Sequence, residues 1–413
     1  MLSADVKRKL VEGVREFSLA FDPRRWREEA ERAFALLELG GPLRALTPLG
    51  FRSRPRLELA ASPSPYCRAF GLDGGSTRPI HFANGTTLCA NQAVMLGEPP
   101  QELEGLPLDA FRTVALVTHS FSPSGGPKAD YHEHEDGLLA LWRVHLTRDY
   151  LWGEIDHVLK GLADSASEAR HGQRLAERLD LGRADLLILD GNVFPIGLYY
   201  LLKERSRGGD LLAFPGAVEA LAGHLRLAEF LAQRGTAYVG INKTPQTAYL
   251  LEALPERGPW ADDRQFIRAL FLGLAKDRLG WTNWFVQERY PSPGRSGARA
   301  EGSDIFHELA EFEPQLRPEE YHVAYFFVFD PQATEGQGSV LKVEAPRLVL
   351  SRHDPEELQL AVLSEIARGE GVPPLLRRAD SRARITQEER EALIKSCGLP
   401  PDLGYNQGRG EPW

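Results

Sequence analysis

Two aspartates in this chain occupy the same kind of local sequence. Asp73 ends an apolar stretch that begins at Arg68, Asp190 ends one that begins at Asp185, and a glycine follows each aspartate. Such a run predicts a buried strand, and the glycine permits a sharp turn beside the carboxylate. If the two strands are neighbours, their carboxylates would lie close together and could bind one Mg²⁺ or Mn²⁺ ion. Such ions catalyse phosphodiester hydrolysis. Taken singly, each aspartate is more simply explained as the cap of a turn or helix.

A third carboxylate is needed, because one or two hold these ions weakly. Residues 162–180 are predicted to be helical, and at about 100° per residue Glu168 falls on the apolar face of that helix. A core-facing carboxylate needs a partner, and a metal ion is one candidate. The alternative is a glutamate that reaches solvent from the helix edge. Glu177 lies off this face and is the second choice. The apolar face is formed by Leu162, Ala169, Leu175, Ala176 and Leu179.

Lys243 directly follows a short apolar strand predicted over residues 236–241. A cation at the end of a strand near an acidic cluster could hold a scissile phosphate or stabilise developing negative charge. A lone lysine in a loop is more often exposed to solvent, so this signal is weak by itself.

Three histidines suggest a different metal site. His132 and His134 could point to one side of an extended segment, with His119 as a third ligand of an unrelated metal-dependent phosphoesterase. We prefer a solvated loop, because the segment follows a Gly- and Pro-rich tract and contains several acids. Metal preference separates these alternatives, since sites made only of oxygen favour Mn²⁺ and Mg²⁺, whereas a histidine-rich site favours Zn²⁺.

Composition places the chain among ordinary globular proteins of a reducing cytoplasm. Its 413 residues are 42% hydrophobic and 26% charged, with a formal net charge of −9 and three scattered cysteines. No apolar run is long enough to span a membrane, at about eighteen residues, and the N-terminus lacks the apolar core of a signal peptide. The negative charge lowers the expectation of nucleic-acid binding without excluding a basic groove. There is no phosphate-binding loop of the Walker type.

The order of predicted elements favours an α/β protein with a mixed sheet. Helices are predicted over residues 3–39, β structure over 55–98 with a hairpin at Asn84-Gly85, and a strand over 111–119. Residues 137–181 are predicted to be mostly helical, and 290–303 to form a mobile loop. Paired strands follow at 321–329 and 339–350, and Thr386 with Glu389 caps the last helix. Antiparallel strands first, then strands alternating with helices, indicate a mixed sheet.

The order of these motifs resembles the NurA nuclease family over residues 66–397. The carrying motifs are the two Asp-Gly strand ends, a hairpin after the first, and a helix with a glutamate before the second. They also include the stretch from Gly240 to Thr244, a strand like 341–346, and a Pro-rich turn and helix ending near Asp380. The chain departs from the family pattern by an extra glycine at Gly75, by Asn192 where serine is usual, and by Asp380 where histidine is expected.

The resemblance implies a ribonuclease H-like mixed sheet core with helical elaborations, a homodimer, and Mn²⁺-dependent degradation of DNA, with Mg²⁺ as a possible substitute. It implies 5′-to-3′ exonuclease and single-strand endonuclease activity in end resection and double-strand-break repair, beside a HerA-type hexameric ATPase. The expected domains are N-terminal helices over 1–55, a nuclease domain over 56–400 with a helical insertion near 137–181, and a tail over 401–413. A non-catalytic adaptor of the same fold is the alternative.

The resemblance also implies roles for individual residues. The metal ligands would be Asp73, Asp190 and Asp380 with Glu168 or Glu177, and Lys243 and Arg295 would contact DNA phosphates. A second observation also predicts a homodimer. The helix near residues 3–18 has an apolar face that a short N-terminal helix does not readily bury within its own chain.

Overall fold

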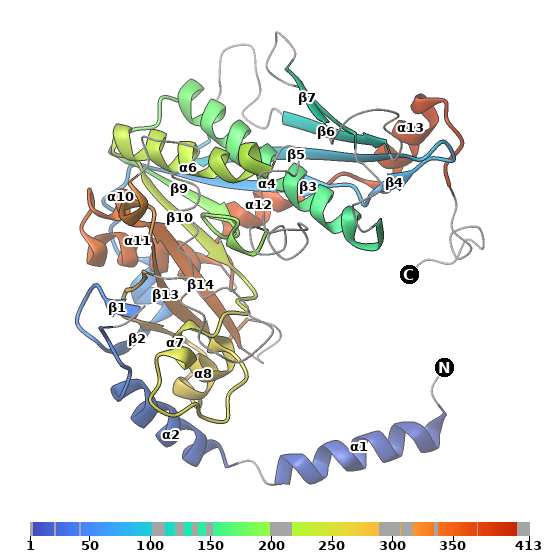
Figure 1. The fold of residues 1–413 in the computed structure, drawn as a ribbon. Helices are drawn as coiled ribbons and strands as arrows, with labels where there is room; N and C mark the ends of the chain where they lie inside the picture. Colours follow the sequence, from blue (N-terminus) through green and yellow to red (C-terminus); the bar gives the residue numbers. More distant parts are fainter. Residues whose placement is uncertain are drawn as a thin grey trace.

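The computed structural model describes residues 3–19, 22–40, 43–100, 112–119, 128–133, 139–145, 152–198, 217–288, 306, 317–333, 338–369 and 371–402. Within these residues, strands far apart in the sequence join one mixed sheet, which helices cover on both faces (Figure 1). The main path runs, in sheet order, through β1 (Leu43–Ala45), β12 (Phe285–Gln287), β13 (Val323–Asp330), β14 (Ser339–Pro346), β10 (Ala237–Asn242), β9 (Asp185–Asp190), β3 (Arg68–Ser76), β5 (Thr86–Glu98), β6 (Arg112–His119), β8 (Leu139–His145) and β7 (Lys128–Glu133). Beside it lie β11 (Arg278–Thr282), β2 (Phe51–Pro55) and β4 (Ile80–His81).

The centre of the sheet changes from antiparallel to parallel pairing at β3. Strands β3, β5 and β6 pair antiparallel, whereas β3 pairs parallel with β9, and β9 pairs parallel with β10. Parallel neighbours require crossover connections, and α4 (Trp152–Arg178) and α6 (Ala217–Arg234) precede β9 and β10 in the chain. The predicted mixed α/β fold is confirmed, and this five-strand unit is compatible with a ribonuclease H-like core.

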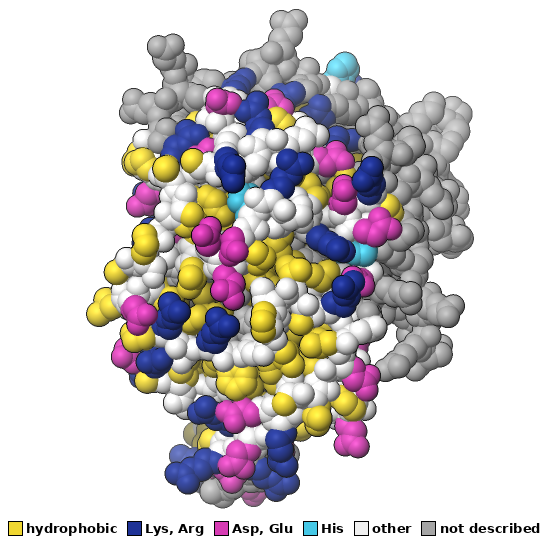
Figure 2. Space-filling view, turned by 90° about the vertical axis from the view of Figure 1, so that its left-hand side faces the viewer, with side chains coloured by type: hydrophobic (Ala, Val, Ile, Leu, Met, Phe, Trp, Pro, Cys, Tyr) yellow, Lys and Arg dark blue, Asp and Glu magenta, His cyan; other side chains and the backbone are white. Residues whose placement is uncertain are grey.

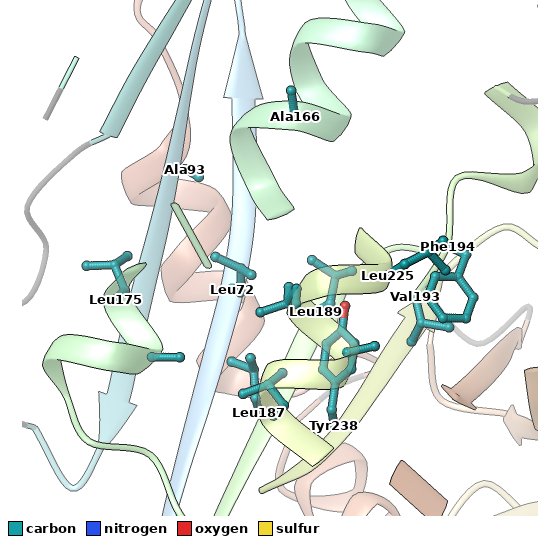
Figure 3. Packing of buried hydrophobic residues seen from close by; sticks show 14 of the residues in the cluster. Leu72, Ala93, Ala166, Leu175, Leu187, Leu189, Val193, Phe194, Leu225 and Tyr238 are labelled. Carbon is teal, nitrogen blue, oxygen red and sulfur yellow. The ribbon is translucent and has the colours of Figure 1, made fainter. Parts of the chain in front are cut away.

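Helices α4 and α6 cover one face of this central unit. Their apolar side chains pack with Leu72 of β3, Leu187 and Leu189 of β9, and Tyr238 of β10 (Figure 3). The opposite face packs against α11 (Pro355–Arg368) and α12 (Pro374–Ala383), with Ile188 of β9 among the buried residues. Neighbouring residues of a strand face opposite sides, so each central strand contributes to both layers of the core.

The remaining helices surround the other half of the sheet and its ends. Helices α2 (Pro23–Ala35) and α8 (Asp263–Leu270) pack together over β12 and β13 in a third apolar cluster. Helix α1 (Ala4–Leu19) stands away from the rest of the molecule (Figure 1), and Val6, Leu10 and Val11 on it are exposed. Among the described residues, further helices are α3 (Arg56–Ala60), α7 (Tyr249–Glu252), η2 (Pro318–Glu320), α10 (Arg347–Leu350) and α13 (Gln387–Cys397).

One side of the molecule carries no patch of a single charge among its described residues. Figure 2 shows the side on which α10 and α11 lie in Figure 1, with Lys and Arg interspersed with Asp and Glu around exposed hydrophobic side chains. Phosphate groups of DNA are attracted by basic residues gathered on one surface. The described part of this side shows no such gathering of basic residues. None of the helices in the described residues is long and apolar enough to cross a membrane.

The structure differs from the predicted organisation in three places. His132 lies in strand β7 rather than in the solvated loop that we preferred for its segment. The prediction of helix from residue 137 was wrong for β8, where Ala140 and Trp142 are buried and Arg143 is exposed, the period of a strand. Residues 1–55 are not only helices, because β1 and β2 pair with β12 and β11 of the main sheet. Residues 290–303 and 403–413 lie outside the described residues.

Candidate active site

Two neighbouring parallel strands bring Asp73 and Asp190 together. Leu72 of β3 pairs with Leu189 of β9, so the two aspartates follow at the same level of the sheet. At the other end of the strands, Arg68 and Asp185 form an ion pair of 2.6 Å that holds the same register. The prediction that Asp73 is the last residue of its strand was wrong. Strand β3 continues to Ser76, paired with β5. Asp73 lies instead just past the end of the pairing with β9.

The two carboxyl groups interact strongly because both are withdrawn from water. Asp73 is only 7% exposed. Burial, and next the negative charge of Asp190, raise the pKa of Asp73 from 3.8 to about 7. Burial also raises the pKa of Asp190, although Lys243 opposes this effect, and Asp73 lies close enough to form a hydrogen bond with Asp190. Two carboxylates this close favour one shared proton over two negative charges.

Glu168 approaches this pair from α4 through a gap left by glycine. A Cβ atom on Gly74 would lie 2.6 Å from Glu168 Oε1, so only glycine leaves room for the carboxylate at this position. The glutamate is partly buried, and its pKa is raised well above 4.5 by burial first, then by the charges of Asp164, Asp73 and Asp190. The structure thus places Glu168 beside the strand ends, on the core-facing side of its helix.

The extra glycine of the first motif also has a structural reason. A Cβ atom on Gly75 would lie 1.8 Å from the carbonyl oxygen of Ala383, at the end of α12. The two successive glycines therefore admit α4 on one face of β3 and α12 on the other.

Lys243 and Asp380 complete the charged surroundings. Lys243 Nζ forms an ion pair with Asp190 Oδ2. Asp380 lies on α12, with its side chain 52% exposed and 3.8 Å from Arg384. Its negative charge raises the pKa values of Asp73 and Asp190, so it lies near both, at the solvent side of the cluster.

Two predicted site residues are not brought to this cluster. Glu177 is exposed and accepts a hydrogen bond from Gln173 on its own helix. It follows Glu168 by nine residues, which is about 13 Å along the helix and about half a turn around it. Glu177, which we predicted as the alternative metal ligand, therefore does not lie with the other predicted ligands. Arg295 lies outside the described residues.

The backbone register separates two of the three histidines of the alternative metal site. Strand β8 lies between β6, which carries His119, and β7, which carries the exposed His132. His119 pairs with His145, which pairs with Lys128, four residues before His132. The two backbone positions are thus about 10 Å apart across the sheet and about 13 Å apart along it, too far for one ion. His134 lies outside the described residues.

Sequence reasoning missed a polar group on α4 next to Glu168. Asp164 forms an ion pair of 2.5 Å with Lys160 and accepts a hydrogen bond from the buried side chain of Asn91 in β5. Lys160, Asp164 and Glu168 follow one another at intervals of four residues, so they form one stripe along the helix. That spacing was visible in the sequence, but only the position of β5 shows that the stripe borders the acidic cluster.

The donor atoms of this cluster fit a hard divalent cation. Asp73, Asp190 and Glu168 offer only carboxylate oxygens, the ligands preferred by Mn²⁺ and Mg²⁺. In the part of the chain that the structure describes, no three such side chains are arranged as a ready metal site. The ammonium group of Lys243 instead neutralises one of these carboxylates, Asp190.

Comparisons with known proteins identify related sequences and folds. A family model described as the NurA domain matches residues 68–385. The crystal structure of the NurA nuclease from Sulfolobus solfataricus has a TM-score of 0.49 at 11% sequence identity, covering 96% of this chain and 97% of that chain. A structure of NurA bound to dAMP and manganese has a TM-score of 0.47 at 11% identity, covering 96% and 98%. No curated protein matches the chain.

Proposed function

Because this chain belongs to the NurA family, we propose that it is a metal-dependent nuclease that hydrolyses phosphodiester bonds of DNA. The observation that carries the proposal is the meeting of one buried and two partly buried carboxylates, from β3, β9 and α4, each with a raised pKa. Burying repelling acids is costly unless a cation joins them, and perturbed carboxyl groups of this kind gather at catalytic sites.

Asp73, Asp190 and Glu168 would hold a Mn²⁺ or Mg²⁺ ion, with Asp380 contributing from the solvent side. When bound, such an ion supplies Lewis acidity for phosphodiester hydrolysis. The chain must first ionise its ligands, since Asp73 has a pKa of about 7 and is partly protonated at neutral pH. The affinity for the cation is therefore expected to rise with pH up to about 7, because the cation competes with the proton on Asp73.

Lys243 is suited to two successive partners. Without a cation in the cluster it neutralises Asp190. If Asp190 served as a metal ligand, the ammonium group of Lys243 would be available to a phosphate oxygen of the substrate. Its side chain is 34% exposed, so DNA can reach it.

The finer features of the proposal extend the family resemblance. They are 5′-to-3′ exonuclease and single-strand endonuclease activity, a role in end resection during double-strand-break repair, and cooperation with a HerA-type hexameric ATPase. A homodimer is also proposed, because the apolar side chains of Val6, Leu10 and Val11 on α1 are exposed in the single chain.

The test is cleavage of end-labelled single-stranded DNA by the purified protein with Mn²⁺, Mg²⁺ or Zn²⁺. We expect activity with the first two ions and its loss in Asp73→Asn and Asp190→Asn, because asparagine keeps the shape but not the charge that holds a hard cation. Asp5→Asn is the matched control, since Asp5 is exposed on α1 and pairs with Arg8. No cleavage by the wild type under any condition would favour the non-catalytic adaptor, and full activity in either site variant would remove that residue from the site.

A further inference from the structure

The turn that follows Asp190 is held by three contacts outside its own segment. Gly191 N–H donates to the carbonyl oxygen of Ile241 at 3.1 Å. The side chains of Asn192 and Asn242 share a hydrogen bond of 2.9 Å. Val193 N–H donates to Glu344 Oε2 at 3.3 Å. The first two contacts come from β10, next to Lys243, whereas the third comes from β14, one strand further from Asp190.

Glu344 is itself immobilised by a buried counter-charge. Glu344 and Lys342 are 3% and 2% exposed, and they form an ion pair of 2.8 Å on the same face of β14. The ammonium group of Lys342 also lies over the rings of Tyr249 and Tyr325, at 4.7 and 4.4 Å from their centroids. A buried ion pair often adds little net stability compared with apolar residues of similar volume. The buried ion pair is therefore better explained by the hydrogen bond from Val193 that Glu344 accepts than by a contribution to stability.

Glu344 also lies near Tyr238, whose pKa is affected by Glu168 of the candidate site. Tyr238 of β10 is fully buried between Leu189 and Val193 (Figure 3). Burial first, and then the negative charges of Glu168 and Glu344, raise the pKa of Tyr238, so both carboxylates lie near its side chain. Glu344 pairs with Gly240, two residues after Tyr238 on β10, so Glu344 and Glu168 both lie near this tyrosine.

We propose that Glu344 is a positioning residue, which fixes Val193 and through it the turn that aims the carboxylate of Asp190 at the other acids. The proposal rests on the proposed nuclease function. A catalytic carboxylate must be held within a fraction of an ångström by neighbours that are themselves immobile. Lys342 supplies that immobility by fixing the carboxylate that accepts from Val193.

Two double variants separate the hydrogen bond from the ion pair. Lys342→Met with Glu344→Gln keeps an oxygen acceptor for Val193, whereas Lys342→Met with Glu344→Leu removes it. Both remove the charges of Lys342 and Glu344 together, and methionine packs well against the tyrosine rings. The two variants thus differ in the side-chain amide at position 344, which supplies the acceptor, while the charge removed is the same.

We expect the glutamine variant to keep kcat within about threefold of the wild type and the leucine variant to lose about tenfold or more, because an orphaned buried N–H releases the turn. KM for DNA should stay the same, since no DNA contact changes. Amide hydrogen exchange at Val193 should be slow in the wild type and the glutamine variant, and fast in the leucine variant.

Equal kcat in both variants would overturn the proposal, whether both match the wild type or both lose activity together. If the leucine variant does not fold, exchange in the wild type decides, and a freely exchanging Val193 amide overturns the anchor. If the wild type cleaves no DNA, the nuclease proposal fails separately, and exchange at Val193 still tests whether Glu344 anchors the turn.

Discussion

Replacing Asp73 by asparagine should stabilise the metal-free protein at neutral and alkaline pH. Burial and the charge of Asp190 raise the pKa of Asp73 from 3.8 to about 7 in the folded protein. The unfolded carboxyl titrates near pH ~3.9. Between these two values the folded protein binds a proton that the unfolded chain has released, so the free energy of unfolding falls as pH rises through this window. Asparagine carries no charge and escapes this loss.

The size of the effect follows from the shift. About three pKa units, at about 1.36 kcal/mol per unit, give an upper limit of about 4 kcal/mol above pH ~7 and almost nothing near pH ~4. For a chain of 413 residues, with an unfolding entropy of about 2.1 cal/mol/K per residue, this corresponds to a rise of about 5 °C in Tm. The variant therefore gains stability by losing a group that the proposed function requires.

The assay is calorimetric melting of wild type, Asp73→Asn and the exposed-site control Asp5→Asn in EDTA at several pH values. The difference between Asp73→Asn and wild type should grow with pH between ~4 and ~7 and then level off. Mn²⁺ at a hundredfold excess over its Kd should stabilise the wild type by about 2.7 kcal/mol and leave Asp73→Asn nearly unchanged. A variant that is less stable than wild type at pH ~8 in EDTA, or a difference independent of pH, would refute the reasoning.

The remaining predictions concern the third acid and the oligomeric state. Glu168→Gln should abolish DNA cleavage and the Mn²⁺-induced rise in Tm, whereas Glu177→Gln should change neither, because Glu177 is exposed and away from the cluster; the reverse pattern would transfer the ligand role to Glu177. Light scattering should give a wild-type mass about twice the 46.0 kDa of one chain, and Leu10→Asp should lower it, because Leu10 is exposed on α1; a wild type at the mass of one chain contradicts the dimer.

Local sequence was sufficient for features that depend on neighbouring residues. The capping box of Thr386 and Glu389 is present at the start of α13, and Gly398 ends that helix in the left-handed conformation. The hairpin at Asn84-Gly85 forms, with β4 and β5 on its two sides. Glu168 faces inward because helical periodicity decides which residues share a face. These features follow from short-range sterics and hydrogen bonds, which act within a few residues.

Local pattern was insufficient where long-range pairing decides the structure. Residues 139–145 are a strand because β6 and β7 pair with them, although helix was predicted there. Gly75 leaves no room for a side chain because the carbonyl oxygen of Ala383, far along the chain, lies directly over it. Neither contact leaves a local signal, since backbone propensities are weak compared with tertiary packing.

The sequence by itself determined which residues could form the site: acids at the ends of apolar strands, a glutamate on an apolar helix face, and a lysine after a third strand. Only the tertiary structure decided that β3 and β9 are neighbours, that Lys243 pairs with Asp190, and that Glu344 holds Val193 across 151 positions of sequence. The physical reason is that side-chain type and periodicity are local properties, whereas the register between strands and the meeting of buried charges are set by the whole packed core.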